Sequence, residues 1–166
     1  AAEFYYMRQP EKVLQMARAW TSPRSNGPEA WMTLAEAYEQ FGRRGEALAT
    51  LEQILASDNS NYALSYAGML LGRLGQRAEA EKIRADLEQR ATKGYVPSFC
   101  LALVYFGLGN DDKGFFYLER AYAERNYELI FAYPFDPQFD HLRNDSRNVQ
   151  LLRRYNLPLK APEKSL

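Results

Sequence analysis

Apolar residues recur every three or four positions along most of the chain, which is the pattern of amphipathic helices. The first clear stripe comprises Trp31, Leu34, Ala35 and Tyr38, and it stops at Gly42, a residue type that readily ends helices in the left-handed conformation. A second stripe begins near position 46 and comprises Ala47, Leu48, Leu51, Ile54 and Leu55. The next residues suited to a turn and a helix cap are Asp58, Asn59 and Asn61. This pattern predicts two helices joined by a tight turn.

The same pair of helices is predicted twice more, over residues 62–90 and 96–125. The glycines that end the first helix of each pair, Gly42, Gly75 and Gly109, lie 33 and 34 residues apart. Three further sets of positions step by 34, 33 and 34 residues: Ala1, Ala35, Gly68 and Ala102; Phe4, Tyr38, Leu71 and Tyr105; Val13, Ala47, Ala80 and Gly114. Small residues at two of these sets let helices cross closely, and the bulky set fills the space between pairs. The period therefore predicts a helical repeat protein.

These residues resemble the signature of the tetratricopeptide repeat (TPR). The first repeat carries it at Trp31, Leu34, Ala35, Tyr38, Gly42, Glu46 and Ala47. The second keeps Leu64, Gly68, Gly75, Glu79 and Ala80, and the third keeps Leu101, Ala102, Tyr105, Gly109, Leu118 and Ala121. The chain departs from the pattern at Arg84, where a large apolar residue is usual, and at Gly114, where alanine is usual. The resemblance implies an all-α fold, a right-handed α-α superhelix of about three and a half helical hairpins.

The expected domain organisation follows from the period. A TPR solenoid over residues 1–126 divides into a partial repeat, 1–27, and the repeats 28–60, 61–94 and 95–126. Ala1 aligns with the middle of a first helix, so we expect part of that helix to lie upstream in a longer protein. Capping helices are expected over residues 127–157, followed by a tail, 158–166.

The C-terminal segment carries its own signals. Asp136 and Asp145 are suited to cap two short helices, which would close the open end of the solenoid. Residues 136–147 and 151–154 resemble the closing segment of TPR regions in bacterial signalling proteins, which include winged-helix regulators and nucleotide cyclases. The pair Asn148 and Val149 departs from the aromatic residue common there. This resemblance implies that the chain is part of a larger bacterial regulatory or signalling protein.

The amino-acid composition argues against several classes of function. The 166 residues include 21 basic and 21 acidic side chains, so no net charge attracts nucleic acid or an anionic membrane. We therefore expect no direct nucleic acid binding and, without a long apolar run, no membrane insertion. A single Cys100 and a single His141 leave no internal disulfide and no metal cluster, and we expect no cofactor. The lone cysteine fits a reducing cytoplasm, with the periplasm as the alternative.

The chain is not expected to be an enzyme. Cys100 and His141 lie in different segments, and no third residue is placed to orient them, so we interpret Cys100 as a buried packing residue. The glycines fall once per hairpin and do not cluster into a phosphate-binding loop. The basic pairs Arg43–Arg44 and Arg153–Arg154 are expected in a solvated turn and at a helix end.

The expected binding surface is the concave side of the superhelix, which the first helices of the repeats line. Counting one turn from the buried stripe places there Tyr5, Met32, Glu36, Glu39, Tyr62, Tyr66, Met69, Arg73, Phe99, Leu103 and Phe106. Aromatic and apolar residues of this kind make good anchors for a peptide or helix from a protein partner. The corresponding positions lack the Lys, Asn and Arg with which some TPR domains clamp acidic chaperone tails, so that binding mode is not expected.

A second hypothesis stays open from the sequence alone. In this hypothesis the chain is a structural or oligomerisation domain that can form a homo-oligomer. Its groove is then filled by its own residues 127–166. An unfilled apolar groove would favour a partner, and a filled one would favour the structural role.

Overall fold

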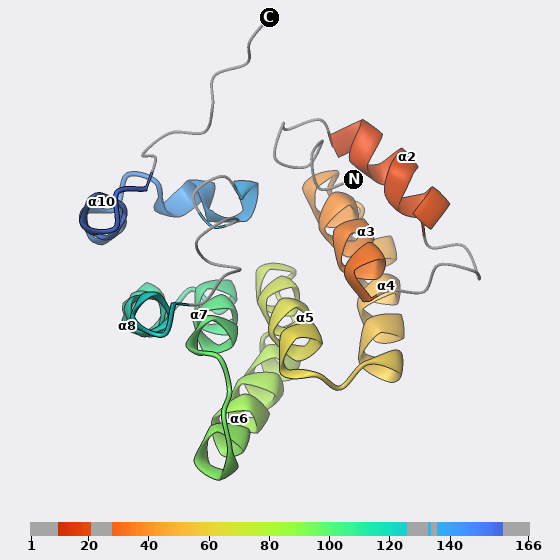
Figure 1. Ribbon diagram of the computed structural model, residues 1–166. Coiled ribbons are helices and arrows are strands. Elements are labelled where there is room, and N and C mark those ends of the chain that lie inside the picture. Colours follow the sequence, from red (N-terminus) through yellow and green to blue (C-terminus); the bar gives the residue numbers. More distant parts are fainter. Residues whose placement is uncertain (1–9, 21–27, 126–132, 134–135, 158–166) are drawn as a thin grey trace, which may run out of the picture.

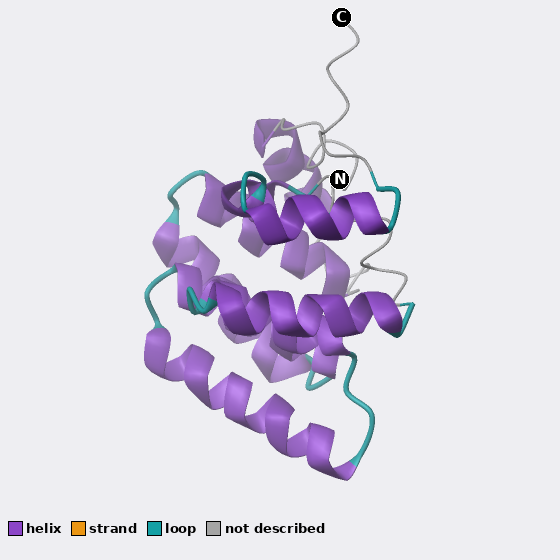
Figure 2. Cartoon of the chain, turned by 90° about the vertical axis from the view of Figure 1, so that its left-hand side faces the viewer, coloured by secondary structure: helices purple, strands orange, loops and turns teal. Residues whose placement is uncertain are grey.

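The computed structural model describes residues 10–20, 28–125, 133 and 136–157, and every element within these ranges is a helix. The elements are α2 (Pro10–Trp20), α3 (Pro28–Gln40), α4 (Arg44–Ser57), α5 (Asn61–Arg73), α6 (Arg77–Lys93), α7 (Ser98–Gly107), α8 (Asp111–Ala123), the 3-10 helix η1 (Pro137–Leu142) and α10 (Ser146–Arg154). Short loops join most of them (Figures 1 and 2). None of these helices is long and apolar enough to cross a membrane.

The helices pair into three hairpins, α3 with α4, α5 with α6 and α7 with α8. Helix α2 packs against α3, and the first helices of the hairpins, α3, α5 and α7, pack against one another in that order. The hairpins follow an arc, with η1 above α7 and α10 beside α8 (Figure 1). The prediction of an all-α helical repeat solenoid is confirmed.

Each hairpin turns by the same backbone device. Gly42 has a φ of +67°, and its N–H donates to the carbonyl of Glu39 over 2.9 Å while the N–H of Arg43 donates to Tyr38 over 2.8 Å. These two bonds satisfy carbonyls that the helix end would leave unpaired. The same pair of bonds recurs at Gly75 and Gly109, which also have positive φ. The glycine spacing in the sequence therefore marked the turns correctly.

The cap between the first two full repeats differs from the prediction. Ser60, not a neighbouring asparagine, caps α5, because its hydroxyl accepts the N–H of Ala63 over 3.1 Å. Asp58 supports the turn, since its carboxylate accepts the N–H of Ser60 over 2.8 Å. Asn59 and Asn61 instead accept hydrogen bonds from Arg90 at the end of α6. Serine and asparagine are equally good helix caps, so residue type alone does not show which of them caps α5.

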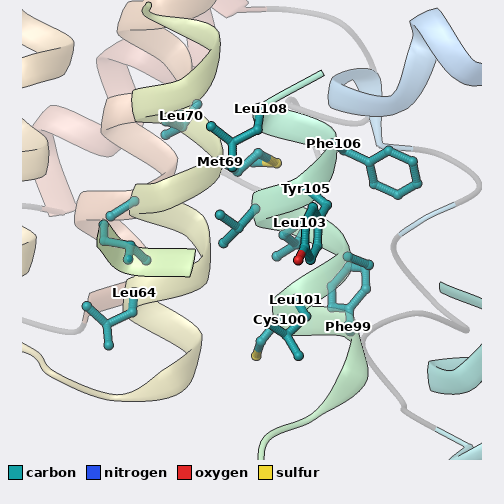
Figure 3. Packing of buried hydrophobic residues seen from close by; sticks show 14 of the residues in the cluster. Leu64, Met69, Leu70, Phe99, Cys100, Leu101, Leu103, Tyr105, Phe106 and Leu108 are labelled. Atoms are coloured by element: carbon teal, nitrogen blue, oxygen red, sulfur yellow. The ribbon is translucent and has the colours of Figure 1, made fainter. Parts of the chain in front are cut away.

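The core lies between the helices of neighbouring repeats. Leu64 and Met69 of α5 lie in the cluster with Leu103 of α7, while Phe99 and Phe106 of α7 point to the opposite side (Figure 3). Every residue of α7 is buried. A helix that is covered all round must have neighbours on every side. The third hairpin therefore needs cover from the C-terminal segment as well as from α5.

Helices α5 and α7 touch backbone to backbone. A Cβ placed on Gly72 would lie 2.6 Å from the carbonyl carbon of Gly107, and one placed on Gly107 would lie 2.5 Å from the Cα of Met69. Both distances are shorter than real Cβ atoms show. Any side chain at either position would push the two helices apart. The period of the sequence did not reveal this pair.

The two departures from the TPR pattern have physical explanations. Arg84 pairs with Glu81 and Glu88, and its guanidinium lies 5.9 Å from the ring centroid of Tyr105, so it takes part in an ionic cluster instead of an apolar contact. A Cβ on Gly114 would lie 2.5 Å from Cδ1 of Phe106. The missing methyl group therefore leaves space for the Phe106 ring.

Candidate protein-binding site

The first helices of three repeats present a shared surface. We call it the concave face and define it by Glu36 and Glu39 of α3, Tyr66 and Arg73 of α5, and Phe106 of α7. Arg73 ties two repeats together, because its Nε and one terminal nitrogen donate to the two carboxylate oxygens of Glu39 over 3.1 and 3.0 Å. Such two-point pairing fixes direction as well as distance. The concave face thus has an ordered polar side and an aromatic side.

The chain's own helix η1 occupies this face. The side-chain amide of Gln138 donates to Glu36 Oε1 over 2.8 Å, a contact between residues 102 positions apart, and to Asp136 Oδ2 over 3.2 Å. Arg73 approaches the backbone carbonyl of Gln138 over 3.5 Å. Asp136 caps η1, as predicted, by accepting the N–H of Gln138 over 2.9 Å. One residue of the C-terminal segment is therefore bound by two different repeats.

Phe139 adds an apolar anchor directly after Gln138. Its ring centroid lies 6.0 Å from that of Phe106 in an edge-on arrangement and 4.6 Å from that of Tyr133. Phe139 is 4% exposed and Phe106 is 5% exposed, so the pair is buried. Aromatic pairs of this geometry add to the free energy of burial. Gly114 provides the space in which Phe106 meets this ring.

On the polar side of the concave face, burial and neighbouring charges shift the pKa values of two residues. Burial, and then the nearby Asp136 carboxylate, raise the pKa of Glu36 well above its ordinary value, whereas Arg73 and the hydrogen bond from Gln138 act in the opposite direction. Burial also raises the pKa of Tyr66, with further contributions from Glu36, Tyr62 and Asp136. Tyr66 therefore stays neutral over the physiological range. The Asp136 carboxylate shares the buried environment of Glu36 and so disfavours ionisation of Glu36.

Helix α10 holds the segment from the outside. Asp145 caps it as predicted, accepting the N–H of Arg147 over 2.9 Å. The guanidinium of Arg147 lies 4.4 Å from the ring centroid of Phe115 and pairs with Asp112 over 2.6 Å, both on α8. Asn148 is buried and its side-chain oxygen accepts a hydrogen bond from the hydroxyl of Tyr133 over 2.8 Å. The C-terminal segment thus covers the last hairpin.

The structure divides the residues predicted for the concave site. Glu39, Tyr62, Tyr66 and Arg73 keep some exposure, and Tyr5 lies outside the described residues. The buried members are Met32, Glu36, Met69, Phe99, Leu103 and Phe106. Met69 and Leu103 belong to the core between repeats, because counting turns along one helix does not show which face the next repeat covers. The buried residues are not available to a partner while η1 is in place.

Three residues that contact or shape this site were missed. Asp136, Gln138 and Phe139 were assigned to the cap, and nothing in the sequence indicated that Gln138 contacts α3. The sequence shows only a glutamine directly before a phenylalanine, which does not specify a binding contact.

A hollow lies between α4 and α6, away from the concave face. It has a volume of about 430 Å³. Its lining residues are Leu48, Leu51, Glu52, Leu55, Leu71, Gln76, Glu79, Lys82 and Ile83. The floor is aliphatic and the rim is charged.

The two residues considered for chemistry lie on different helices, Cys100 on α7 and His141 on η1. Cys100 is buried and free, and His141 is exposed, with its Nδ1 3.1 Å from the carbonyl of Gln138. No group of three potential metal ligands occurs among the residues that the structure describes. Arg43 pairs with Glu46 at the start of α4, and Arg153–Arg154 end α10 as predicted.

Comparison with known proteins agrees with this architecture. A family model for the tetratricopeptide repeat matches residues 28–67, which comprise α3, α4 and the first half of α5. No curated protein and no solved structure matches the chain. The match shows that residues 28–67 are similar to a tetratricopeptide repeat, and the structure places them in an all-α helical repeat fold. Such a repeat supports a role in protein–protein interaction in general.

The buried carboxylate of Glu36 gives the site a pH dependence. Because its pKa is raised in the folded state, the folded chain binds more protons than the unfolded chain above the ordinary pKa, and stability falls as pH rises through the raised value. Glu36→Gln keeps the acceptor for Gln138 and removes the charge. We expect it to raise the melting temperature at about pH 8, with little change at about pH 4.

Glu39→Gln is the matched control, because Glu39 is paired with Arg73 and lies nearer the solvent. It should give no gain at either pH. Parallel melting curves for the wild type and Glu36→Gln across this range would contradict the assignment.

Proposed function

We propose that the concave face binds a segment of a partner protein and that residues 136–142 occupy it as an internal ligand. The observation that carries this is the convergence of Glu36 and Arg73, from different repeats, on the side chain and backbone of the single residue Gln138. Recognition of both groups is what a peptide-binding surface requires. A partner segment would replace η1 and gain the same contacts.

The wider setting belongs to the same proposal. The resemblance of the closing segment supports a place within a larger bacterial regulatory or signalling protein in the cytoplasm. The proposal includes the domain boundaries expected from the period, with repeats ending near positions 60, 94 and 126.

One observation favours the structural role as a second candidate. Glu36 and Phe106 are buried beneath the chain's own segment, so the face is already filled. In that case η1 is a permanent part of the core, and self-association would use another surface, such as the hollow between α4 and α6.

Binding in trans separates the two candidates. The combined variant Gln138→Ala and Phe139→Ala should loosen η1, and amide exchange over residues 136–142 would verify this. A labelled synthetic peptide of residues 136–145 should then bind the variant at least about tenfold more tightly than the wild type, where the tethered segment competes at high effective concentration.

Phe116→Ala, which alters an exposed aromatic residue on α8, is the control and should behave as the wild type. If η1 is released and the peptide still does not bind, the concave face is not a peptide site and the structural role holds.

A further inference from the structure

The occupant of the concave face does not fully match it. Gln138 donates to Glu36, but its own side-chain oxygen is buried and accepts no hydrogen bond from the described residues. A buried acceptor without a donor is costly. A side chain at this position that has hydrogen-bond donors and no acceptor would leave no unpaired buried oxygen.

The charges around Glu36 point to the same kind of side chain. Among the described residues, Glu36 takes part in no ion pair, since Arg73 is engaged by Glu39 over 2.9 Å. Asp136 leaves together with η1, so the vacated face would retain Glu36, Glu39 and Arg73. Two carboxylates and one guanidinium give this surface a formal charge of −1. A cation would therefore be attracted where the neutral amide of Gln138 now lies.

The backbone and the aromatic contact fix the order of residues. Arg73 faces the carbonyl of Gln138, and the next side chain, Phe139, meets Phe106. A segment that binds in this register places one side chain at Glu36 and the following side chain at Phe106.

We propose that the concave face selects a partner segment in which a lysine or arginine directly precedes an aromatic residue. This inference rests on the proposed function and names the chemistry of its partner. The cation donates to Glu36, its carbonyl accepts from Arg73, and the ring packs edge-on against Phe106. Hydrogen bonds to a charged donor are roughly twice as strong as neutral ones, so such a segment displaces η1.

Labelled peptides of residues 136–145 test the inference on the full chain carrying Gln138→Ala and Phe139→Ala. The peptide with Gln138→Lys should bind at least about tenfold more tightly than the native peptide, and the peptide with Gln138→Glu at least about tenfold more weakly. The control peptide carries His141→Lys, which adds the same charge at an exposed position, and should bind as the native one does.

The advantage of lysine should disappear when the receptor also carries Glu36→Gln. If the native peptide binds and the lysine peptide binds no better, the inference is overturned while the proposed function stands. If no peptide binds a chain whose η1 has been released, both fail.

A second measurement needs no peptide. In the intact chain, Gln138→Lys should raise the amide-exchange protection of residues 137–142 by about tenfold, and Gln138→Glu should lower it. Lower protection with lysine than with glutamine would also overturn the inference.

Discussion

The chain with Gly107→Ala should be less stable than the wild type by about 3 kcal/mol or more, at the upper end of the usual cost of overpacking. A Cβ at this position would lie 2.5 Å from the Cα of Met69, so a backbone stands in its way and no side-chain rotation relieves the clash. Helices α5 and α7 must then separate, and the core around Leu103 loses its packing. Urea denaturation followed by circular dichroism would measure the loss.

Gly45→Ala is the matched control. Gly45 lies in α4 with no atom within 4 Å of an added Cβ, and alanine is the better helix former by roughly 0.5–1 kcal/mol. This variant should therefore be slightly more stable than the wild type. Equal destabilisation by both substitutions would mean that the close contact of α5 and α7 does not limit the fold.

Removing residues 127–166 should have the largest effect of all. The described part of this segment buries five large side chains, those of Tyr133, Phe139, Leu142, Leu151 and Leu152. Burying each contributes about 1.5–3 kcal/mol, and their removal also uncovers Phe106 and α8. We expect a lower melting temperature and concentration-dependent association, seen by sedimentation. Relief of the buried charge at Glu36 offsets only part of the loss.

A chain ending at Leu157 is the control, because it retains every described contact of the C-terminal segment. It should melt as the full chain does. A truncated protein that stays monomeric with an unchanged melting temperature would show that the segment is not needed to cover the third hairpin.

The features that the sequence predicted are local ones. Gly42, Gly75 and Gly109 mark turns because a positive φ excludes most other residues there. Asp136 and Asp145 mark helix starts because their carboxylates lie beside the N–H groups they cap. In each case the residue and its partner are separated by a few positions.

The features that the sequence did not predict depend on how distant segments meet. Periodicity shows that Glu36 lies off the apolar stripe, and a charged residue there is normally solvated. Its burial follows only once Gln138 is known to lie against it. The contact of Gly72 with Gly107 likewise depends on the angle at which two helices cross, which no repeat period encodes.

The hydrogen bond between Gln138 and Glu36 changes the topology of the array. In an open solenoid each repeat contacts only its neighbours, so the ends can unfold while the middle stays ordered. Here the segment that follows the last repeat contacts the first helix of the first full repeat. The C-terminal segment therefore links the two ends of the array, α3 and α8. Loss of order in either α3 or η1 then breaks the contact between Gln138 and Glu36. This contact opposes fraying of α3 while η1 is bound, and its formation requires an encounter between residues 102 positions apart.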